Sequence, residues 1–161
     1  MEPNPYASPS TSQPPVVAAS AAARPLGVKI LTIWLGLFAG VVPIVAVLFA
    51  YQQPEVRRLL ELTPLLVALS VTLGAAIIVA AIAAWRGSNT GRYALLSLSV
   101  VHYGLVAWNN FNFATSQDLP VNSAQAWARV VRSLITIGIL VWYFALSSRP
   151  EVFYRRDRAA P

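Results

Sequence analysis

Long apolar stretches that contain no charged residue recur four times along the chain. They cover residues 30–54, 62–85, 93–117 and 133–148. A helix rises about 1.5 Å per residue and the hydrocarbon core of a bilayer is about 30 Å thick, so about 20 residues cross it. The apolar residues do not alternate with a period of two, and a helix satisfies its own backbone groups in lipid. Each stretch therefore predicts a transmembrane helix.

The predicted fold is all-α, an integral membrane four-helix bundle with up-and-down connections that occupies residues 27–148. The expected spans are about 29–51, 63–85, 92–110 and 128–148. Residues 86–92 (RGSNTGR) contain two glycines and predict a tight turn. The second and third spans are therefore expected to pair as an antiparallel hairpin.

The third and fourth stretches are less regular than the first two. The third turns polar at Asn109, so its span is expected to begin at Arg92. Residues 109–127 are expected to form a polar outer connection, with a short interfacial helix around residues 121–127 as an alternative to an irregular loop there. The sixteen uncharged residues of the fourth stretch reach only about 24 Å. Its helix is therefore expected to begin near Ala128. That start places Arg132 roughly 6 Å inside the helix end, with its guanidinium snorkelling to the headgroups.

The two ends of the chain differ from the apolar blocks. Residues 1–26 are dominated by Pro, Ser, Ala and Thr and show no hydrophobic period. They cannot bury enough apolar area to offset their ordering entropy, so they predict a disordered N-terminal arm. Residues 149–161 carry four arginines directly after the last span. The sequence therefore predicts a basic cytoplasmic tail that lies on anionic lipid.

The overall composition excludes several classes of protein. Of the 161 residues, 57% are hydrophobic and 11% are charged, and the mean hydropathy is +0.58. A soluble domain has about 25% charged residues, so these values exclude a disordered chain and are hard to reconcile with a water-soluble monomer. Because the chain has no cysteine, disulfides, zinc–thiolate sites, iron–sulfur clusters and thiol catalysis are excluded as well.

The net charge of +6 bears on orientation rather than on nucleic acid. The cations flank the apolar blocks, and no nucleic-acid fold accompanies them, so no nucleic-acid partner is predicted. With four spans, the face that holds both termini carries eight cations and the other face carries four. The positive-inside rule then places both termini in the cytoplasm and the chain in the cell (inner) membrane. The eight are Arg24, Lys29, Arg86, Arg92, Arg149, Arg155, Arg156 and Arg158, and the four are Arg57, Arg58, Arg129 and Arg132.

Small residues with helix-packing spacing lie on the first two predicted spans. Gly36 and Gly40 are four residues apart, and Ser70 and Gly74 repeat this spacing on the second span. Small side chains allow helix backbones to approach closely in lipid. Packing inside the bundle is the favoured interpretation, because the four spans must first contact one another. A homo-oligomer face or a membrane partner is the alternative.

Two features inside the predicted spans are candidates for function. Pro43 lies in the middle of the first span, where proline removes a backbone hydrogen bond and kinks the helix. Its functional interpretation is a hinge or a cavity, and the plainer one is a tolerated kink. His102 is the sole histidine, and helical spacing places it on one polar stripe of the third span with Ser99, Asn109 and Asn110.

This polar stripe has two interpretations. His102 could act as a proton relay or ligand contact that faces the bundle interior. The favoured interpretation is a neutral histidine hydrogen-bonded to a neighbouring helix, because no carboxylate lies at the same depth. Arg132 is a further ligand candidate through an outer-leaflet ion pair with Asp118. A snorkelling arginine and a solvated loop acid are the simpler interpretation there.

No motif in the sequence points to catalysis. No acidic residue lies inside a predicted span, and Gly-x-Ser-x-Gly, His-Glu-x-x-His and phosphate-binding loops are absent. We therefore expect no catalytic residue, no cofactor and no metal, and a non-enzymatic structural or partner-binding membrane protein. The alternative is a subunit of a small transporter or channel that uses the Pro43 kink and the His102 stripe.

Short segments at the ends of the apolar region resemble those of known proteins. Residues 24–31 (RPLGVKIL) precede the first span, and residues 148–152 (SRPEV) follow the last. They resemble segments of uncharacterised small four-span bacterial inner-membrane proteins, and residues 4–9 (NPYASP) are similar to short arms on some bacterial membrane proteins. The resemblance implies a multi-pass bacterial membrane protein and brings no catalytic residue with it.

Overall fold

The computed structural model describes residues 25–115 and 123–147 together with Tyr154. Within these ranges every regular element is helical, which confirms the all-α prediction. Asp118, nearly all of the predicted N-terminal arm and the basic tail apart from Tyr154 lie outside the described residues.

The first apolar stretch forms one rod of three consecutive segments. These are α1 (Leu26–Leu35), the π-helical segment η1 (Gly36–Val41) and α2 (Val42–Gln52). Pro43 gives a reason for the change of winding, because it has no N–H to donate and its ring crowds the preceding turn. The widened turn just before it, where an amide donates to the carbonyl five residues back, gives that ring room.

Prolines also mark the next two helix starts. At Gln53 the backbone is extended (φ −92°, ψ 112°), as is usual before a proline, and the short helix α3 (Pro54–Leu59) follows. A second proline opens α4 (Pro64–Trp85). The hydroxyl of Thr63 caps that helix by accepting a hydrogen bond from the amide of Leu66 at 3.2 Å.

A tight turn reverses the chain between α4 and α5 (Asn89–Thr115). Gly87 has a φ of 95°, in the left-handed region that favours glycine. Ser88 then caps α5, because its hydroxyl accepts a hydrogen bond from the amide of Gly91 at 3.2 Å.

Three helical rods are long and apolar enough to cross a membrane. They are Leu26–Gln52, Pro64–Trp85 and Ser123–Leu146. The third of these joins α6 (Ser123–Val141) to a second π-helical segment, η3 (Trp142–Leu146). Among the described residues α5 is also a long helix, with 27 residues, but its Ser, His and Asn side chains dilute the apolar ones and it is not one of the three.

The third helix extends beyond its predicted end. A polar connection was expected from Asn109 onward, but α5 continues to Thr115. The helix accommodates its polar side chains by bonding them to its own backbone: Asn110 donates to the carbonyl of Val106 at 2.7 Å, and Thr115 donates to that of Phe111 at 2.9 Å. A run of polar residues therefore did not mark the end of this helix.

The fourth helix is already formed at Ser123, rather than from near Ala128 as predicted. Phe111 of α5 meets Trp127 of α6 edge to face, with ring centroids 5.7 Å apart, so this early turn has a packing partner. Arg132 consequently lies about 13 Å along α6 from Ser123, deeper than the predicted 6 Å.

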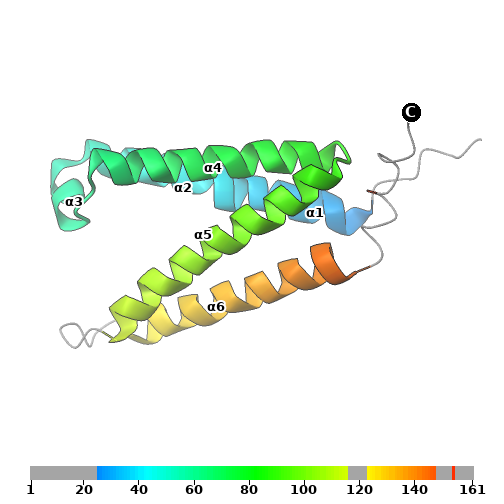
Figure 1. The fold of residues 1–161 in the computed structure, drawn as a ribbon. Coiled ribbons are helices and arrows are strands. Elements are labelled where there is room, and N and C mark those ends of the chain that lie inside the picture. Colours follow the sequence, from blue (N-terminus) through cyan, green and yellow to red (C-terminus); the bar gives the residue numbers. More distant parts are fainter. Residues whose placement is uncertain (1–24, 116–122, 148–153, 155–161) are drawn as a thin grey trace, which may run out of the picture.

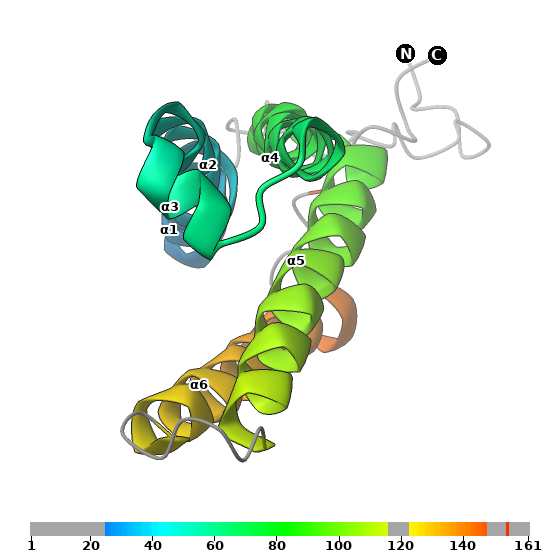
Figure 2. The ribbon, with the colours of Figure 1, turned by 90° about the vertical axis from the view of Figure 1, so that its left-hand side faces the viewer.

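The helices pack as two pairs that meet at one end (Figures 1 and 2). The α1–η1–α2 rod lies beside α4, and α5 lies beside α6. Because α5 starts against the end of α4 and then diverges from it, the two pairs open as a V. The turn after α4 and the end of α6 lie at the closed end of this V.

The main apolar cluster lies toward the closed end of the V. It consists of Leu35, Ala39, Ile77, Ala80, Ala81, Ala84, Leu95, Leu140 and Phe144. The start of α5 approaches α4 very closely there, because a Cβ atom on Gly91 would lie 2.6 Å from the backbone nitrogen of Ala84. A side chain at this position would require one of the two helices to move.

Candidate functional site

A cavity of about 520 Å³ lies inside the V, between the first rod and the α5–α6 pair. Trp34, Phe38 and Val42 form its apolar wall. Their spacing of four residues keeps them on one side of the rod.

The opposite wall of this cavity is polar and comes mainly from α6. Arg129, Arg132, Ser133 and Thr136 all line it. Separations of three and four residues place these side chains on one helical face. From the sequence, Arg129 was counted only as a cation of the outer face and Arg132 was named as a ligand candidate, whereas the structure places both arginines on the wall of one cavity.

Helix α5 forms the floor of the cavity with His102, Tyr103 and Val106. The ring of Tyr103 stacks on that of Trp34, with centroids 6.3 Å apart and planes inclined by 12°. This contact ties the first rod to α5 across the V. His102 meets the edge of Tyr103 at 5.1 Å.

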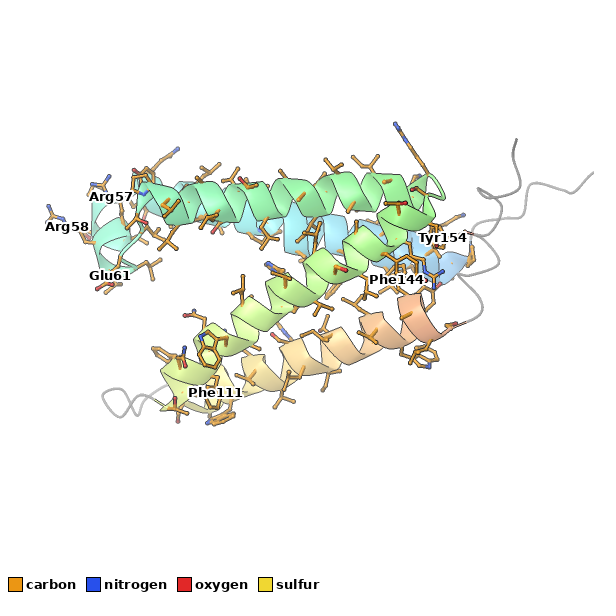
Figure 3. The ribbon with its side chains drawn as sticks, in the orientation of Figure 1. Arg57, Arg58, Glu61, Phe111, Phe144 and Tyr154 are labelled. Carbon is orange, nitrogen blue, oxygen red and sulfur yellow. The ribbon has the colours of Figure 1, made fainter. Side chains whose placement is uncertain are left out.

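The cavity carries positive charge with no described carboxylate near it. In residues 25–115 and 123–147 the acidic side chains are Glu55 and Glu61, and neither lines the cavity. Figure 3 shows Glu61 at the tip of the upper pair, with Arg57 and Arg58. The Asp118 proposed as an ion-pair partner for Arg132 lies outside the described residues.

A second cavity, of about 240 Å³, adjoins the first and shares His102 and Val106 with it. Its lining includes Pro43, Ser70 and Asn109. The imidazole of His102 therefore lies between two hollows, one facing α6 and one facing α4. This cavity therefore brings together Pro43, the predicted kink residue, and two residues of the predicted polar stripe, His102 and Asn109.

The rest of the predicted stripe does not reach these cavities. Ser99 is fully buried, and its hydroxyl has no hydrogen-bond partner among the described residues. Asn110 donates to the carbonyl of Val106 in its own helix. Helical spacing alone could not separate these residues, because the position of the neighbouring helices decides which part of a stripe faces a cavity.

The small residues of the first two spans face one another inside this chain. A Cβ atom on Gly74 would lie 2.9 Å from the carbonyl oxygen of Gly40, and one on Gly36 would lie 3.4 Å from the Cβ of Ala81. Ser70, one turn before Gly74, lines the second cavity. Gly40 and Gly74 thus lie where the first rod and α4 approach most closely.

A second polar cluster, which sequence reasoning missed, lies at the closed end of the V. Arg92 is only 2% exposed. Its Nε donates to the carbonyl oxygen of Phe144 at 2.6 Å, and its Nη2 donates to the same oxygen. Its guanidinium also lies over the rings of Tyr93 and Tyr154, at 5.1 and 5.4 Å.

Tyr154 closes this cluster (Figure 3). Its side chain is 1% exposed, and its hydroxyl donates to the carbonyl oxygen of Ala84 at 3.2 Å. Burial raises the pKa of Tyr154 to about 12, although the charge of Arg92 acts in the opposite direction. Arg92 and Tyr154 therefore satisfy carbonyls near the ends of two different helices, where the helix dipole favours a cation.

Sequence patterns carried little sign of this cluster. Arg92 was counted as an interfacial cation, and Tyr154 was treated as part of a tail lying on lipid. The acceptor oxygen of Phe144 lies in a π-helical segment, and no pattern in the sequence predicted that segment. The one available signal was an arginine in the first helical turn, where a cation opposes the helix dipole and needs a compensating partner.

Comparison of the chain with protein-family models, with curated proteins and with solved structures finds no match. The function is therefore inferred from the fold and from the two cavities that His102 lines.

Proposed function

We propose that this chain is a multi-pass protein of the bacterial inner membrane that crosses the bilayer four times, with both termini in the cytoplasm. Three apolar rods support the proposal, and the 27 residues of α5 extend about 40 Å, enough for a fourth crossing. The polar residues of α5 are compatible with a crossing, because Ser99 is buried and His102 lines cavities within the protein.

We propose that its role is to bind a ligand or partner rather than to catalyse a reaction. The observation that carries this proposal is the cationic cavity, whose volume falls in the range of about 300–1,000 Å³ typical of ligand sites. His102 and Ser133 both line it, but among the described residues no hydrogen bond joins them and no carboxylate orients the imidazole. A nucleophile and its base need such contacts.

Cysteine labelling tests the topology directly, because the natural chain contains no cysteine. We expect Gly87→Cys to react with a membrane-impermeant maleimide only after the cells are opened, and Pro120→Cys to react in intact spheroplasts. Labelling of both positions from the same side would contradict a crossing by α5 between them, and with it the four-span topology.

Photo-crosslinking in native membranes tests the binding role. A photoreactive residue at Thr136, which lines the cavity, should give one defined adduct. The same residue at Ile135, a neighbouring side chain that is 57% exposed, serves as the control and should give only dispersed lipid adducts. Identical adduct patterns at both positions would contradict a binding cavity.

A transporter or channel subunit is the second candidate. The observation that favours it is the position of Pro43 and its π-helical turn beside the second cavity, next to His102. Pro-kinked helices that line a polar cavity are suited to gating. Flux through liposomes that contain the natural chain, lowered by Pro43→Ala and His102→Ala, would support this function, and negligible flux in all three would eliminate it.

A further inference from the structure

We propose that the cationic cavity and an adjoining apolar groove form one binding site for an anionic amphiphile. In this site an oxyanion headgroup lies against Arg129 and Arg132, and its hydrocarbon chain follows α1 and α6. The inference rests on the proposed membrane role and specifies the ligand class of that site.

The headgroup end is defined by the two arginines. Arg129 and Arg132 are three residues apart on α6, so their side chains are neighbours on one face and both line the cavity. Guanidinium groups pair with carboxylate and phosphate oxygens through two parallel hydrogen bonds. Arg129 and Arg132 lie within a predicted membrane span, and no carboxylate among the described residues lies beside them. Charged side chains in such a position are typical of a ligand site, and a bound oxyanion would neutralise them.

The chain end is defined by a groove of about 270 Å³ between α1 and α6. Ile30, Leu31, Ile139 and Leu140 line it, together with Trp34 and Thr136. Trp34 and Thr136 also line the cationic cavity, so the polar and apolar hollows are contiguous. A ligand that is charged at one end and apolar at the other would place its charged end in the cavity and its apolar end in the groove.

The length and direction of the site suit an amphiphile whose headgroup points to the outer side of the membrane. From Arg132 to Leu140 the helix rises about 12 Å, close to the thickness of one leaflet of hydrocarbon. In the proposed topology α6 enters the membrane from the outside at Ser123, so the arginines lie on the outer side of the groove. The headgroup would therefore lie at the level of Arg132, about 13 Å along α6 from Ser123, with the hydrocarbon chain pointing inward from it.

The test uses the purified full-length chain in nanodiscs of phosphatidylcholine with a minority of phosphatidylglycerol, with retained lipid counted by native mass spectrometry. We expect one tightly held phosphatidylglycerol per chain. The variant R129Q/R132Q should weaken its retention by at least about tenfold, because two charge-assisted contacts are lost. The control R57Q/R58Q removes the same charge from α3, outside the cavity, and should leave retention unchanged (Figure 3).

A second pair of variants tests the groove. Thr136→Trp places a large side chain where the cavity and the groove meet, and should weaken retention of phosphatidylglycerol. Ile135→Trp makes the same change on the adjacent exposed position and should not. Circular dichroism and thermal unfolding of each variant in detergent identify any that has lost its fold.

Competing ligands distinguish the sources of the anion. If another anionic phospholipid displaces phosphatidylglycerol but a single-chain fatty acid does not, the ligand is a double-chain lipid. If the fatty acid also displaces phosphatidylglycerol, the ligand is a single-chain amphiphile. If inorganic phosphate alone displaced phosphatidylglycerol, the proposal of an amphiphilic ligand would be wrong, because the groove would then contribute nothing to binding. Equal losses in R129Q/R132Q and R57Q/R58Q would overturn the site itself. In either of those two cases, the cysteine-labelling and photo-crosslinking results would still decide the proposed function independently.

Discussion

Arg92 Nε donates a hydrogen bond to the carbonyl oxygen of Phe144, 52 residues later in the chain, at a distance of 2.6 Å. This bond joins the first turn of α5 to the end of the α6–η3 rod, and Tyr154 covers it. Together with the apolar cluster at the closed end of the V, this contact joins the two helix pairs.

Replacing Arg92 with Gln should therefore destabilise the protein. The carbonyl of Phe144 would lose its donor in a buried place, which costs about 1–3 kcal/mol of unfolding free energy. Arg86→Gln is the control, because Arg86 lies on an exposed surface of the same turn and should change stability by less than about 0.5 kcal/mol. Thermal unfolding in a mild detergent measures both, and equal effects would show that the buried bond contributes nothing.

Tyr154→Phe isolates the hydroxyl of Tyr154. The variant keeps the ring over Arg92 but loses the bond to the Ala84 carbonyl, so we expect a loss of about 0.5–1.5 kcal/mol. Unfolding by denaturant in detergent at neutral pH gives the difference. A variant as stable as the natural chain would contradict the bond.

The stability conferred by that hydroxyl should depend on pH in a defined window. The folded pKa of about 12 lies above the ordinary value of 10.0, so the folded state favours the neutral phenol. The contribution is complete below pH 10 and is lost as the pH rises through 12. Comparing the natural chain with Tyr154→Phe from pH 8 to 12 should show a difference that shrinks over the last two units, whereas a constant difference would argue against a buried phenol.

Gly91→Ala tests the close approach of α5 to α4. Its Cβ would lie 2.6 Å from the backbone of Ala84, so we expect a loss of about 1–3 kcal/mol from forced separation of the helices. The same change at Gly104 meets nothing within 4 Å. Because alanine favours helix over glycine, Gly104→Ala should be neutral or up to about 1 kcal/mol stabilising. Unfolding measurements should therefore show a loss of stability for Gly91→Ala and none for Gly104→Ala, and equal losses would contradict the close approach.

Gly74→Leu separates packing inside the chain from packing between chains. The new side chain would meet the Gly40 carbonyl and Ile44 within one molecule, so thermal stability should fall by several degrees. The oligomeric state, measured by light scattering with correction for detergent, should stay the same. A change from dimer to monomer without loss of monomer stability would assign Gly74 to a homo-oligomer face instead.

The apolar blocks and the two glycines of residues 86–92 allowed much of the secondary structure to be predicted. The helices begin near Pro25, Pro54 and Pro64, and the chain turns at Gly87, because proline and glycine act on the backbone locally. The end of α5 was predicted too early, because the bonds of Asn110 and Thr115 to their own helix are available to polar residues only once a helix has formed. The polarity of these residues alone therefore does not show whether the helix ends or continues.

Tertiary placement was much less accessible from the sequence. His102 was recognised as a candidate, but its position between two cavities depends on how far α5 diverges from α4. The pairing of Arg92 with Phe144 joins positions 52 residues apart through a backbone oxygen. A carbonyl is present at every residue, so residue types could not show which one would be the acceptor.

The long sequence separation between Arg92 and its acceptor also imposes an order on biosynthesis. When Arg92 first emerges from the ribosome the last helix has not yet inserted, so the guanidinium must stay hydrated at the surface of the bilayer. It can move out of water only when the last helix inserts. A polypeptide that ends before residue 144 would display an exposed cation that the finished molecule buries.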